Sequence, residues 1–457
     1  MYKKINYMAY TDFIAAIDLG TSHMVGMVGT KNATGALSII AYEVENSGTC
    51  IRRGCVYNVK ETASKIKRLI LKLENKLGGT KIGQVYVGLG GQSLRSIEHT
   101  VCKVLGTEGV VTEEIIDSLY QECKDYRPDM LTVLDVVSPS YFLDDKPESN
   151  PVGVPCSRIE ARYKLIVGRP SLKLNIVNSI SEQAKIEIAG ILVSPLALGD
   201  VVLSDNEKDL GCALIGFGAG VTTISVYKGG KLASLSVVPF GGNLITKDIT
   251  NLRVVESEAE RLKITYGSAK ADRDNDMTIQ VSLADGMGLR EIKLAELNGV
   301  IEARMDEILE NVYARLEATG LMSVLGAGIV ITGGGAALKN LPAVMSERLK
   351  MEVRYSAVRK GIVASGDLVV ASNPEYAVAV GLLAKGTKNC ALYIPPKPEP
   401  KIEPVVEPEP TVEPTPEPVK EKPKKEKKKG PGLFGRLTKG IDTFGKTLFD
   451  DDDNESK

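Results

Sequence analysis

The hydrophobic and polar positions near the start of the chain predict a buried β-hairpin. Phe13 to Asp18 is a short apolar run that ends in an acid, and Met24 to Val28 is a second apolar run. The residues between them, Gly20-Thr21-Ser22, are small and polar. Two runs of this length joined by a tight polar turn are typical of paired strands.

The same pattern returns in the second half of the chain. Cys212 to Phe217 is apolar, residues 218–223 form a turn of small residues, and Ile224 to Tyr227 and Lys231 to Val238 continue as strands. Two halves that each open with strand, small turn and strand indicate an internal duplication.

Further elements follow from the spacing of apolar residues. We predict helices at Thr62 to Leu77, Leu172 to Ala189, Glu256 to Thr265 and Ile301 to Glu317, and strands at Gln84 to Leu89, Gly190 to Leu196 and Gly328 to Thr332.

After the predicted strand at Gln84 to Leu89, the segment to about Ile166 is less regular. Thr112 to Lys124 has a threonine cap and acids in its first turn, which predicts a helix. Leu131 to Val137 and Glu160 to Val167 are apolar enough for strands. We interpret this segment as an inserted α+β subdomain.

Composition separates the C-terminal end from the rest of the chain. Of the 22 prolines, 12 lie between Pro395 and Pro431. Tyr393 to Gly430 is rich in proline, glutamate and lysine and has few large apolar residues, so it cannot bury enough surface to fold. We predict a disordered spacer, with a docking site in its Pro-Glu-Pro repeats as the alternative.

After the spacer, hydrophobic residues return at helical spacing. They are Leu433, Phe434, Leu437, Ile441, Phe444 and Leu448, with charged residues opposite. An amphipathic helix with no domain to pack on favours a membrane-surface anchor over a helix that docks in a partner's groove. The seven lysines between Lys420 and Lys429 would attract anionic lipid, whereas the acids from Asp450 to Asp453 would oppose it.

Charge and cysteine content exclude other classes of protein. The formal net charge of -1 argues against nucleic acid as the main partner. The seven cysteines are an odd set without a C-x-x-C pair, so a disulfide framework or a zinc site is not expected.

The glycine turns suggest a chemistry. Backbone amides in such turns can approach phosphate oxygens closely because no side chain intervenes. Two hairpins facing each other across a cleft would hold a nucleotide's phosphates, and Asp18 would hold a hydrated metal ion. One such turn is usually only a tight turn. Three, each after a buried strand, are a more specific signal.

The motifs carry a resemblance to a known superfamily. Ile17-Asp18-Leu19-Gly20-Thr21-Ser22 resembles the first phosphate motif of the actin, Hsp70 and sugar-kinase superfamily, and residues 331–335 resemble its adenosine motif. Within it the chain is most similar to the FtsA family of bacterial cell-division proteins. The markers that match that family lie at residues 150–153, 238–243, 258–263, 302–304 and 373–383.

The resemblance implies a domain organisation. The fold class is α/β: an actin-like two-lobed fold with an inserted α+β subdomain, a disordered linker and a C-terminal amphipathic helix. The expected bounds are 1–83 and 168–205 for the first lobe, 84–167 for the subdomain, which would serve polymerisation, 206–390 for the second lobe, 391–430 for the linker, 431–449 for the membrane helix and 450–457 for an acidic tail.

The resemblance also implies ATP and Mg²⁺ as cofactors. The expected nucleotide-binding residues are Asp18, Gly20, Thr21, Ser22, Gly218, Gly220, Glu260, Lys263, Gly333, Gly334 and Gly335, with Asp18 also the metal ligand. Glu260 and Lys263 resemble the pair that contacts the ribose. Taken alone they would be a solvated helical ion pair.

The second phosphate motif departs from the pattern of the superfamily. Gly216 stands where an acid is usual, Ala219 where a glycine is usual, and Val221 and Thr223 replace a threonine and a second acid. Phosphoryl transfer depends on positioning and electrostatics, so we expect weak or absent ATP hydrolysis and name no catalytic residue.

The partners are likewise implied by the resemblance. Arg304, with Glu302 and Met305, matches the region that receives the C-terminal peptide of the tubulin-like protein FtsZ. The other expected partners are further copies of the chain, with which it would form filaments, anionic membrane lipids and later division proteins. The expected location is the cytoplasmic face of the membrane at the division site. The alternatives are a sugar kinase, an Hsp70-type ATPase or an adaptor in pilus assembly.

Overall fold

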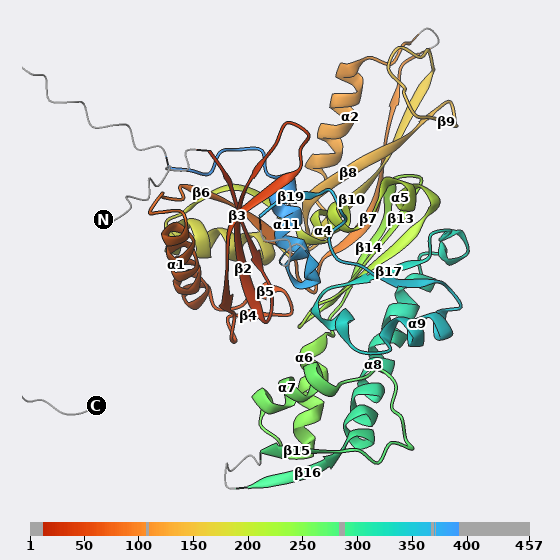
Figure 1. Cartoon of the computed structure of the whole chain (residues 1–457). Coiled ribbons are helices and arrows are strands. Elements are labelled where there is room, and N and C mark those ends of the chain that lie inside the picture. Colours follow the sequence, from red (N-terminus) through yellow and green to blue (C-terminus); the bar gives the residue numbers. More distant parts are fainter. Residues whose placement is uncertain (1–11, 107–108, 283–287, 367–369, 371, 393–457) are drawn as a thin grey trace, which may run out of the picture. The chain divides into compact units, whose positions relative to one another are not determined.

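A computed structural model describes residues 12–106, 109–282, 288–366, 370 and 372–392 of the chain (Figure 1). All of these belong to one compact unit, residues 1–395. The spacer and membrane helix that we predicted from Tyr393 onward lie outside the described residues.

The first sheet has six strands in the order β11-β6-β1-β2-β3-β19. Their bounds are β1 Ile14–Leu19, β2 His23–Lys31, β3 Leu37–Asn46, β6 Gln84–Leu89, β11 Glu187–Val193 and β19 Val363–Ser365. β1 and β2 form the predicted hairpin, closed by the pair Leu19 and Met24. β6 runs parallel to β1, and β11 runs parallel to β6. A short two-stranded sheet of β4 (Ile51–Arg52) and β5 (Cys55–Val56) follows β3 in sequence.

The second sheet repeats this topology. Its order is β14-β13-β12-β17-β18. The bounds are β12 Cys212–Phe217, β13 Thr222–Lys228, β14 Lys231–Val238, β17 Ile329–Thr332 and β18 Val353–Tyr355. β12, β13 and β14 are antiparallel, whereas β17 and β18 run parallel to β12, as β6 and β11 do beside β1. The predicted duplication is confirmed at the level of strand order and direction.

Helices cover both sheets. In the first half they are α1 (Val59–Lys76), α3 (Ser171–Val177), η1 (Asn178–Ala184), α4 (Ser194–Val202) and α5 (Asp205–Leu210), and the C-terminal η5 (Pro374–Tyr376) and α11 (Ala377–Lys385) return to this half. In the second half they are α6 (Gly242–Ile249), η2 (Thr250–Leu252), α7 (Glu256–Tyr266), α8 (Leu294–Glu317), η3 (Met322–Val324), η4 (Gly334–Ala337) and α9 (Leu341–Leu349), with the small hairpin β15 (Thr278–Ser282) and β16 (Leu289–Lys293).

The pair α4 and α11 lies between the two sheets. α11 packs on β1, β2 and β6, and α4 packs on both β11 and β13. The helices cross closely at Gly381, where a Cβ atom would lie 2.3 Å from the backbone oxygen of Ala197. One hydrophobic core therefore joins residues of both sheets, such as Ile17 and Leu214, through these helices. The other face of the second sheet packs on α6 to α9 and forms a separate core.

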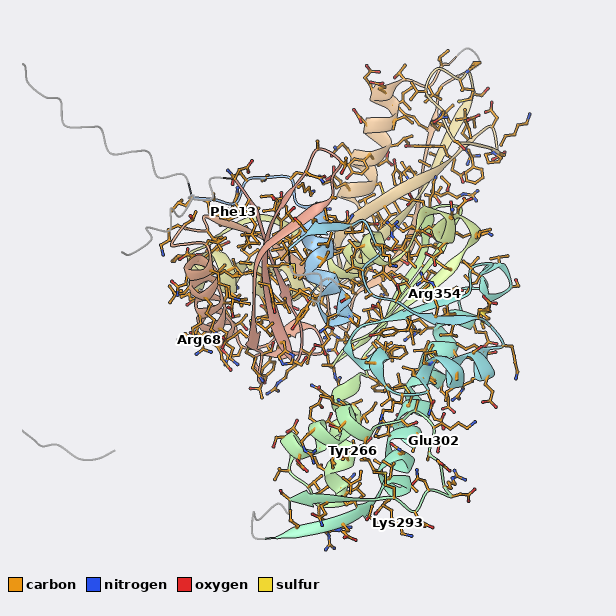
Figure 2. The ribbon with its side chains drawn as sticks, in the orientation of Figure 1. Phe13, Arg68, Tyr266, Lys293, Glu302 and Arg354 are labelled. Atoms are coloured by element: carbon orange, nitrogen blue, oxygen red, sulfur yellow. The ribbon has the colours of Figure 1, made fainter. Side chains whose placement is uncertain are left out.

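The last described residues pack against the first sheet. Phe13, labelled in Figure 2, is 1% exposed and accepts a hydrogen bond from the N–H of Cys390 at 2.7 Å. Leu392 bonds through its N–H to the backbone oxygen of Lys81. The last described residues thus lie beside the starts of β1 and β6, where the described part of the chain begins.

The inserted subdomain is a four-stranded antiparallel sheet in the order β7-β10-β8-β9 with helix α2. Its bounds are β7 Arg95–Val104, α2 Glu113–Asp125, β8 Thr132–Leu143, β9 Lys146–Glu148 and β10 Arg158–Gly168. Thr112 caps α2 as predicted. The predicted start at Gln84 needs correction, because β6 belongs to the first sheet and the inserted sheet begins at β7.

The predicted helix from Leu172 to Ala189 is too long. It ends at Ala184 after a π-helical turn, and Lys185 adopts a left-handed conformation with φ 60°. Strand β11 then begins at Glu187, three residues before the predicted Gly190. Parallel pairing with β6 decides this boundary, which apolar spacing alone could not show.

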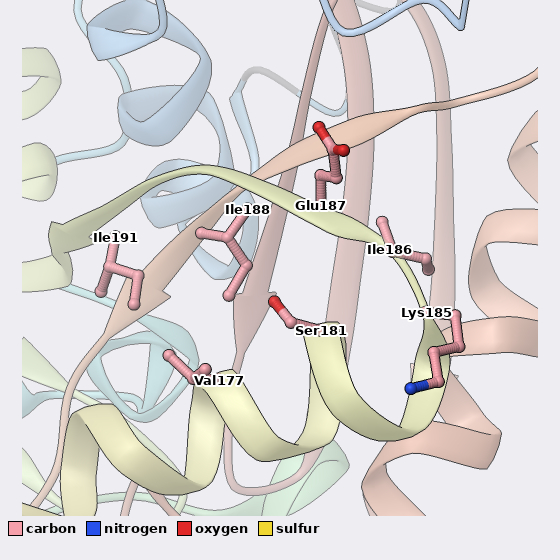
Figure 3. A pocket seen from close by; sticks show the side chains of 7 residues that line it. All are labelled: Val177, Ser181, Lys185, Ile186, Glu187, Ile188 and Ile191. Atoms are coloured by element: carbon pink, nitrogen blue, oxygen red, sulfur yellow. The ribbon is translucent and has the colours of Figure 1, made fainter.

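A surface hollow of about 550 Å³ lies between η1 and β11 (Figure 3). Its walls include Val177, Ile186, Ile188 and Ile191. None of its lining residues is one of the predicted site residues. Among the described residues, no helix is long and apolar enough to cross a membrane.

Candidate functional site

The first glycine turn is Gly20-Thr21-Ser22, between β1 and β2. A Cβ atom on Gly20 would lie 2.5 Å from the backbone oxygen of His23, so only glycine fits this turn without a shift. Ser47 supports the turn: its Oγ donates to the oxygen of Gly20 at 2.7 Å, and its N–H donates to the oxygen of Ser22 at 2.9 Å.

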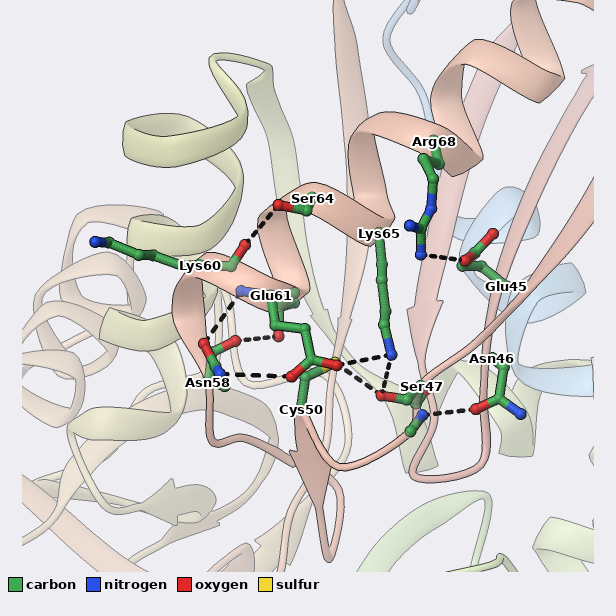
Figure 4. A network of polar contacts seen from close by, with 12 residues as sticks. Glu45, Asn46, Ser47, Cys50, Asn58, Lys60, Glu61, Ser64, Lys65 and Arg68 are labelled. Carbon is green, nitrogen blue, oxygen red and sulfur yellow. Dashed lines mark hydrogen bonds and ion pairs between the residues drawn. The ribbon is translucent and has the colours of Figure 1, made fainter.

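A network of charges on α1 supports Ser47 in turn (Figure 4). Lys65 Nζ lies 2.9 Å from the oxygen of Ser47 and 2.9 Å from Oε1 of Glu61. Asn58 caps the helix by accepting from the N–H of Glu61 at 3.1 Å. Sequence analysis missed Ser47 and Lys65, because Lys65 has the spacing of an ordinary i,i+4 ion pair with Glu61.

The second glycine turn, residues 218–221, joins β12 to β13. The N–H of Gly218 donates to the oxygen of Val221 at 2.9 Å, which closes a tight turn. The oxygens of Gly218 and Ala219 accept from the first residues of α6, Gly242 and Asn243, at 3.0 and 2.8 Å. The predicted marker segment 238–243 therefore holds this turn in place.

The two turns meet. A Cβ atom on Gly220 would lie 2.5 Å from Oγ1 of Thr21. In the described part of the chain, the N–H groups of Thr21, Ser22, Ala219 and Gly220 donate no hydrogen bond to a protein acceptor. Four free amides at one place form an anion-binding arrangement, since each supplies a dipole directed away from the backbone.

The third glycine motif approaches the second turn from β17. Gly333 has φ +87°, which favours glycine, and a Cβ atom on it would lie 2.6 Å from the oxygen of Phe217. A Cβ atom on Gly335 would lie 3.0 Å from Cβ of Phe217, and one on Gly334 would lie 2.9 Å from a carboxylate oxygen of Glu375. The structure thus brings Gly333 to Gly335 close to the end of β12, next to the second turn.

Glu260 and Lys263 form one polar cluster with Thr246. Lys263 Nζ lies 2.7 Å from Oε2 of Glu260 and 2.8 Å from Oγ1 of Thr246, and it donates to the oxygen of Gly242 at 3.1 Å. Thr246 also donates to Glu260. This pair is therefore more than a solvated ion pair, because it joins α7 to the first turn of α6 behind the second glycine turn. Thr246, 14 residues from Glu260, gave no sequence signal.

Asp18 lies near the end of β1, and its carboxylate lies next to Gly88 of the neighbouring parallel strand β6. A Cβ atom on Gly88 would lie 3.2 Å from Oδ1 of Asp18 and 2.6 Å from Oγ of Ser194. Burial raises the pKa of the Asp18 carboxyl to about 6, opposed by a hydrogen bond from the N–H of Leu19. At pH 7 the group remains mostly ionised, as a metal ligand must be.

The residues present fit a nucleotide with a hydrated metal ion. The four free amides suit phosphate oxygens, and Asp18 supplies one carboxylate, which is the usual protein share of a Mg²⁺ site that keeps its waters. Among the described residues, no group of three or more His, Cys, Asp or Glu side chains could hold a metal without the nucleotide.

Gly216 lies where the acid of the motif would stand. A Cβ atom there would lie 2.7 Å from Oγ1 of Thr223 and 3.4 Å from Leu198 in α4. The nearest polar group in this part of the site is therefore a neutral hydroxyl. No side chain at position 216 can orient water as a carboxylate would.

The residues predicted to bind a partner lie on α8. Arg304 pairs with Asp248 of α6, 3.1 Å from its Oδ1, and also with Glu307. The hydrogen bond to Asp248 raises the pKa of Arg304. Glu302, labelled in Figure 2, has a carboxylate oxygen 3.9 Å from the guanidinium of Arg273. Met305 is 2% exposed, so its side chain belongs to the core and cannot contact a docked partner, which corrects that prediction.

A second hollow, of about 410 Å³, is lined by residues that follow α6, the helix whose Asp248 pairs with Arg304. Asn251, Leu252 and Arg253, which follow α6, line it together with Arg290 and Glu296. Arg290 donates to the oxygen of Leu252 at 3.1 Å. The predicted membrane residues, Leu433, Phe434, Leu437, Ile441, Phe444 and Leu448, lie outside the described residues.

Comparisons with known proteins agree with the motifs. The family profile described as "Cell division protein FtsA" matches residues 213–381. The chain is 39% identical over 382 residues to the cell division protein FtsA of Porphyromonas gingivalis, covering 83% of this chain and 79% of that protein. It is 32% identical over 392 residues to the protein of the same name from Bacillus subtilis, covering 84% and 86%.

A solved structure described as "PilM-PilN type IV pilus biogenesis complex" resembles the fold. The match has a TM-score of 0.57 and 16% identity, and it covers 81% of this chain and 97% of that chain. At this identity the likeness concerns the fold alone.

Proposed function

The chain belongs to the FtsA family of cell-division proteins and has an actin-like fold, and from this premise we propose that it binds ATP with Mg²⁺ and self-associates. Through these activities it would tether FtsZ filaments to the cytoplasmic face of the membrane at the division site and recruit later division proteins. The observation that carries the nucleotide part is the meeting of the two glycine turns, with four amides free to bind phosphate.

Each residue at the site has a distinct role in this proposal, through its backbone or through its side chain. The amides of Thr21 and Gly220 bind phosphate oxygens from opposite turns, and Asp18 holds a water of the hydrated metal ion. The metal ion, when bound, supplies positive charge that offsets the phosphates. Gly333 lets the backbone after β17 approach the nucleotide.

We propose that hydrolysis is weak or absent. The site has a carboxylate at Asp18 but none at Gly216, where only the Thr223 hydroxyl is near. A hydroxyl cannot accept a proton at neutral pH, so an attacking water would lack a base.

The nucleotide proposal is tested by measuring ATP affinity with Mg²⁺. Asp18→Ala should weaken binding at least tenfold, because it removes the carboxylate that would hold the hydrated metal ion. Asp117→Ala, which changes an exposed acid of α2, is the matched control and should bind as the unchanged protein does. Equal affinities of all three proteins would refute the nucleotide site.

We place the proposed contact with the FtsZ peptide on the surface around Arg304 and Glu302. Arg304 is 25% exposed, and its partner Asp248 lies on the helix that leads to the second hollow. Arg253 and Arg290 outnumber Glu296, the one acid that lines this hollow, which suits an acidic or carboxylate-bearing peptide.

The peptide proposal is tested by titrating a labelled FtsZ C-terminal peptide. Arg304→Ala should weaken binding about tenfold or more by removing a charged contact. Arg348→Ala is the matched control, because Arg348 also pairs with acids of α8, Asp306 and Glu310, and is 32% exposed. If both variants lose affinity equally, the peptide does not bind specifically at Arg304.

The membrane proposal rests on the amphipathic pattern of residues 433–448. One short helix gives marginal binding, and a filament that presents many of them gains avidity. The full chain should sediment with anionic liposomes, and a chain that ends before Leu433 should not. Equal sedimentation of the two chains would refute the anchor.

The sugar-kinase and Hsp70-type alternatives are not favoured. They predict steady ATP turnover that rises when a sugar or an unfolded peptide is added. The pilus-adaptor alternative has only the similarity of fold in its support. A strong stimulation of turnover by either substrate would overturn our proposal.

A further inference from the structure

The exposed face of α1 carries positive charge without an exposed acid. Five of the exposed residues of this helix are bases, and the others are uncharged. The full set is Lys60, Ser64, Lys67, Arg68, Leu71, Lys72, Asn75 and Lys76. The two acids of the helix are less accessible, since Glu61 is half-buried and Glu74 is buried. A chain with a formal net charge of -1 thus presents one strongly basic helix face.

The acids of the neighbouring strand β3 lie beneath these bases. The side chain of Glu45 is 13% exposed, and it pairs with Arg68, which is 58% exposed, and with Lys72. Glu43 pairs with Lys76 at 2.8 Å. These ion pairs hold the long side chains in place. Because the carboxylates are the more buried partners, the outermost charges of the face remain positive.

Lys60 and Lys67 lie on the same face and are unpaired. Neither has an ion-pair partner among the described residues, and Figure 4 shows Lys60 directed away from the polar contacts around Ser47. Residues separated by 7 and 11 positions lie on one side of an α-helix, so Leu71 continues the stripe that Lys60 and Lys67 begin. Leu71 is 53% exposed. The stripe therefore combines two unpaired cations with an apolar side chain.

The described chain ends beside the last turn of α1. The N–H of Leu392 donates to the oxygen of Lys81 at 2.9 Å, and Lys81 Nζ lies 2.5 Å from Oε2 of Glu74. Glu74 also accepts from the N–H of Ile82 at 3.1 Å. Leu433 and the other predicted membrane residues follow Leu392 along the chain. The tether that we propose therefore leaves the folded part of the protein next to the basic helix.

A basic helix face beside a membrane tether suits an anionic bilayer. Each lysine or arginine close to an anionic leaflet strengthens binding by a factor of about five. With 18 residues, α1 is about 27 Å long, so several of its cations can reach a flat surface together. An exposed leucine among them can enter the headgroup region. Since a tether keeps the folded part near the surface, a weak contact is enough to orient it.

We propose that the exposed face of α1 binds the headgroups of anionic lipids and turns this side of the folded part toward the membrane. The proposal rests on the proposed tether for bringing the chain to the surface, whereas the orientation rests on the charge of α1. The helix would then have two roles on two sides, because Lys65 supports Ser47 on its half-buried side.

Binding is tested with the full chain and vesicles of phosphatidylglycerol and phosphatidylcholine. Lys60→Gln combined with Lys67→Gln should weaken binding about tenfold, because two cations leave the face. Lys124→Gln combined with Lys146→Gln is the matched control, which removes two exposed lysines of the inserted subdomain and should leave binding unchanged. Equal losses by the two double variants, or no loss by the first, would overturn the proposal.

The orientation has its own readout. When the full chain is bound to these vesicles, acylation by a water-soluble amine reagent should slow several-fold at Lys60 and Lys67 and stay unchanged at Lys124. Mass spectrometry of peptides measures each lysine separately. Unchanged reactivity of Lys60 and Lys67 in a vesicle-bound chain would overturn the role of α1 and leave the tether in place.

The tether and the basic face can fail separately. If a chain that ends before Leu433 binds vesicles as the full chain does, with Lys60 and Lys67 still protected, the tether is refuted and the basic face stands. If the full chain binds no anionic vesicle, both are refuted. Protection of the two lysines by polyglutamate but not by vesicles would assign the face to an acidic protein and overturn the lipid proposal.

Discussion

At the scale of single residues, the site depends on a carboxylate in an unfavourable environment. Asp18 has a pKa of about 6 because burial disfavours its charged form. Its ordinary value is 3.8, so the folded chain binds the proton more tightly than the unfolded chain. The protonated group therefore favours folding below pH 4, and this advantage is lost as the pH rises through 6.

Asp18→Asn should therefore stabilise the nucleotide-free protein at high pH. A pKa raised by about two units corresponds to ~3 kcal/mol, and we expect a gain of roughly 1 to 3 kcal/mol at pH 8 that shrinks at pH 5. Thermal melts at the two pH values measure it. The same gain at both would show that the charge of Asp18 is not the cause.

Gly220→Ala should impair nucleotide binding. The new Cβ would lie 2.5 to 2.9 Å from three atoms of Thr21, so the two turns must separate. We expect at least a tenfold loss of ATP affinity, because the free amides on the two turns would no longer converge. Isothermal titration measures the affinity.

Gly299→Ala is the control for this change. Gly299 lies in α8 with no described atom near its Cβ position, so alanine there should improve helix propensity and leave ATP binding unchanged. Unchanged binding by Gly220→Ala would show that the turns can separate without cost.

At the scale of elements, α1 stabilises the first glycine turn through charge. Lys65 is 13% exposed and reaches the oxygen of Ser47, whose hydroxyl and N–H bond the turn. The helix therefore does more than cover the sheet.

Lys65→Met should lower the free energy of unfolding by about 1 to 2 kcal/mol and weaken ATP binding several-fold. It removes the cation but keeps most of the apolar stem. Lys67→Met, on the exposed side of the same helix, should change neither. Equal effects of the two substitutions in melts and titrations would argue against a specific role of Lys65.

At the scale of the whole molecule, the inserted subdomain contacts the second sheet although it is an insertion in the first half. Ser96 of β7 accepts from the N–H of Leu235 at 2.8 Å, and Lys231 donates to the oxygen of Pro139. β14 is the edge strand of its sheet, so the bond from the N–H of Leu235 satisfies one backbone group of an otherwise unpaired edge, while Lys231 adds a side-chain contact.

Ser96→Ala should expose this edge. We expect the amide of Leu235 to exchange hydrogen roughly fivefold faster or more, since a lost hydrogen bond of about 1 kcal/mol changes an opening equilibrium by that factor. Hydrogen exchange resolved to single amides measures it. Leu232, on the same strand but outside this contact, is the internal control. Uniform acceleration along β14 would indicate general destabilisation instead.

Sequence by itself determined the elements whose apolar pattern is local. The strands at Gln84 to Leu89, Cys212 to Phe217 and Lys231 to Val238 have the bounds that we predicted. The glycine turns and Asp18 were found in the same way, because backbone freedom and an acid after a buried strand are properties of adjacent residues. The order and direction of the strands in the two halves likewise agree with the duplicated pattern.

Tertiary structure decided everything that depends on pairing between distant segments. β7 was missed because Arg95 to Val104 is mostly polar and is a strand only through its pairing with β10. The burial of Met305 follows from long-range contacts in the same way. Periodicity describes which residues share a face, but the register between strands decides which side chains meet, and register is set by the whole core.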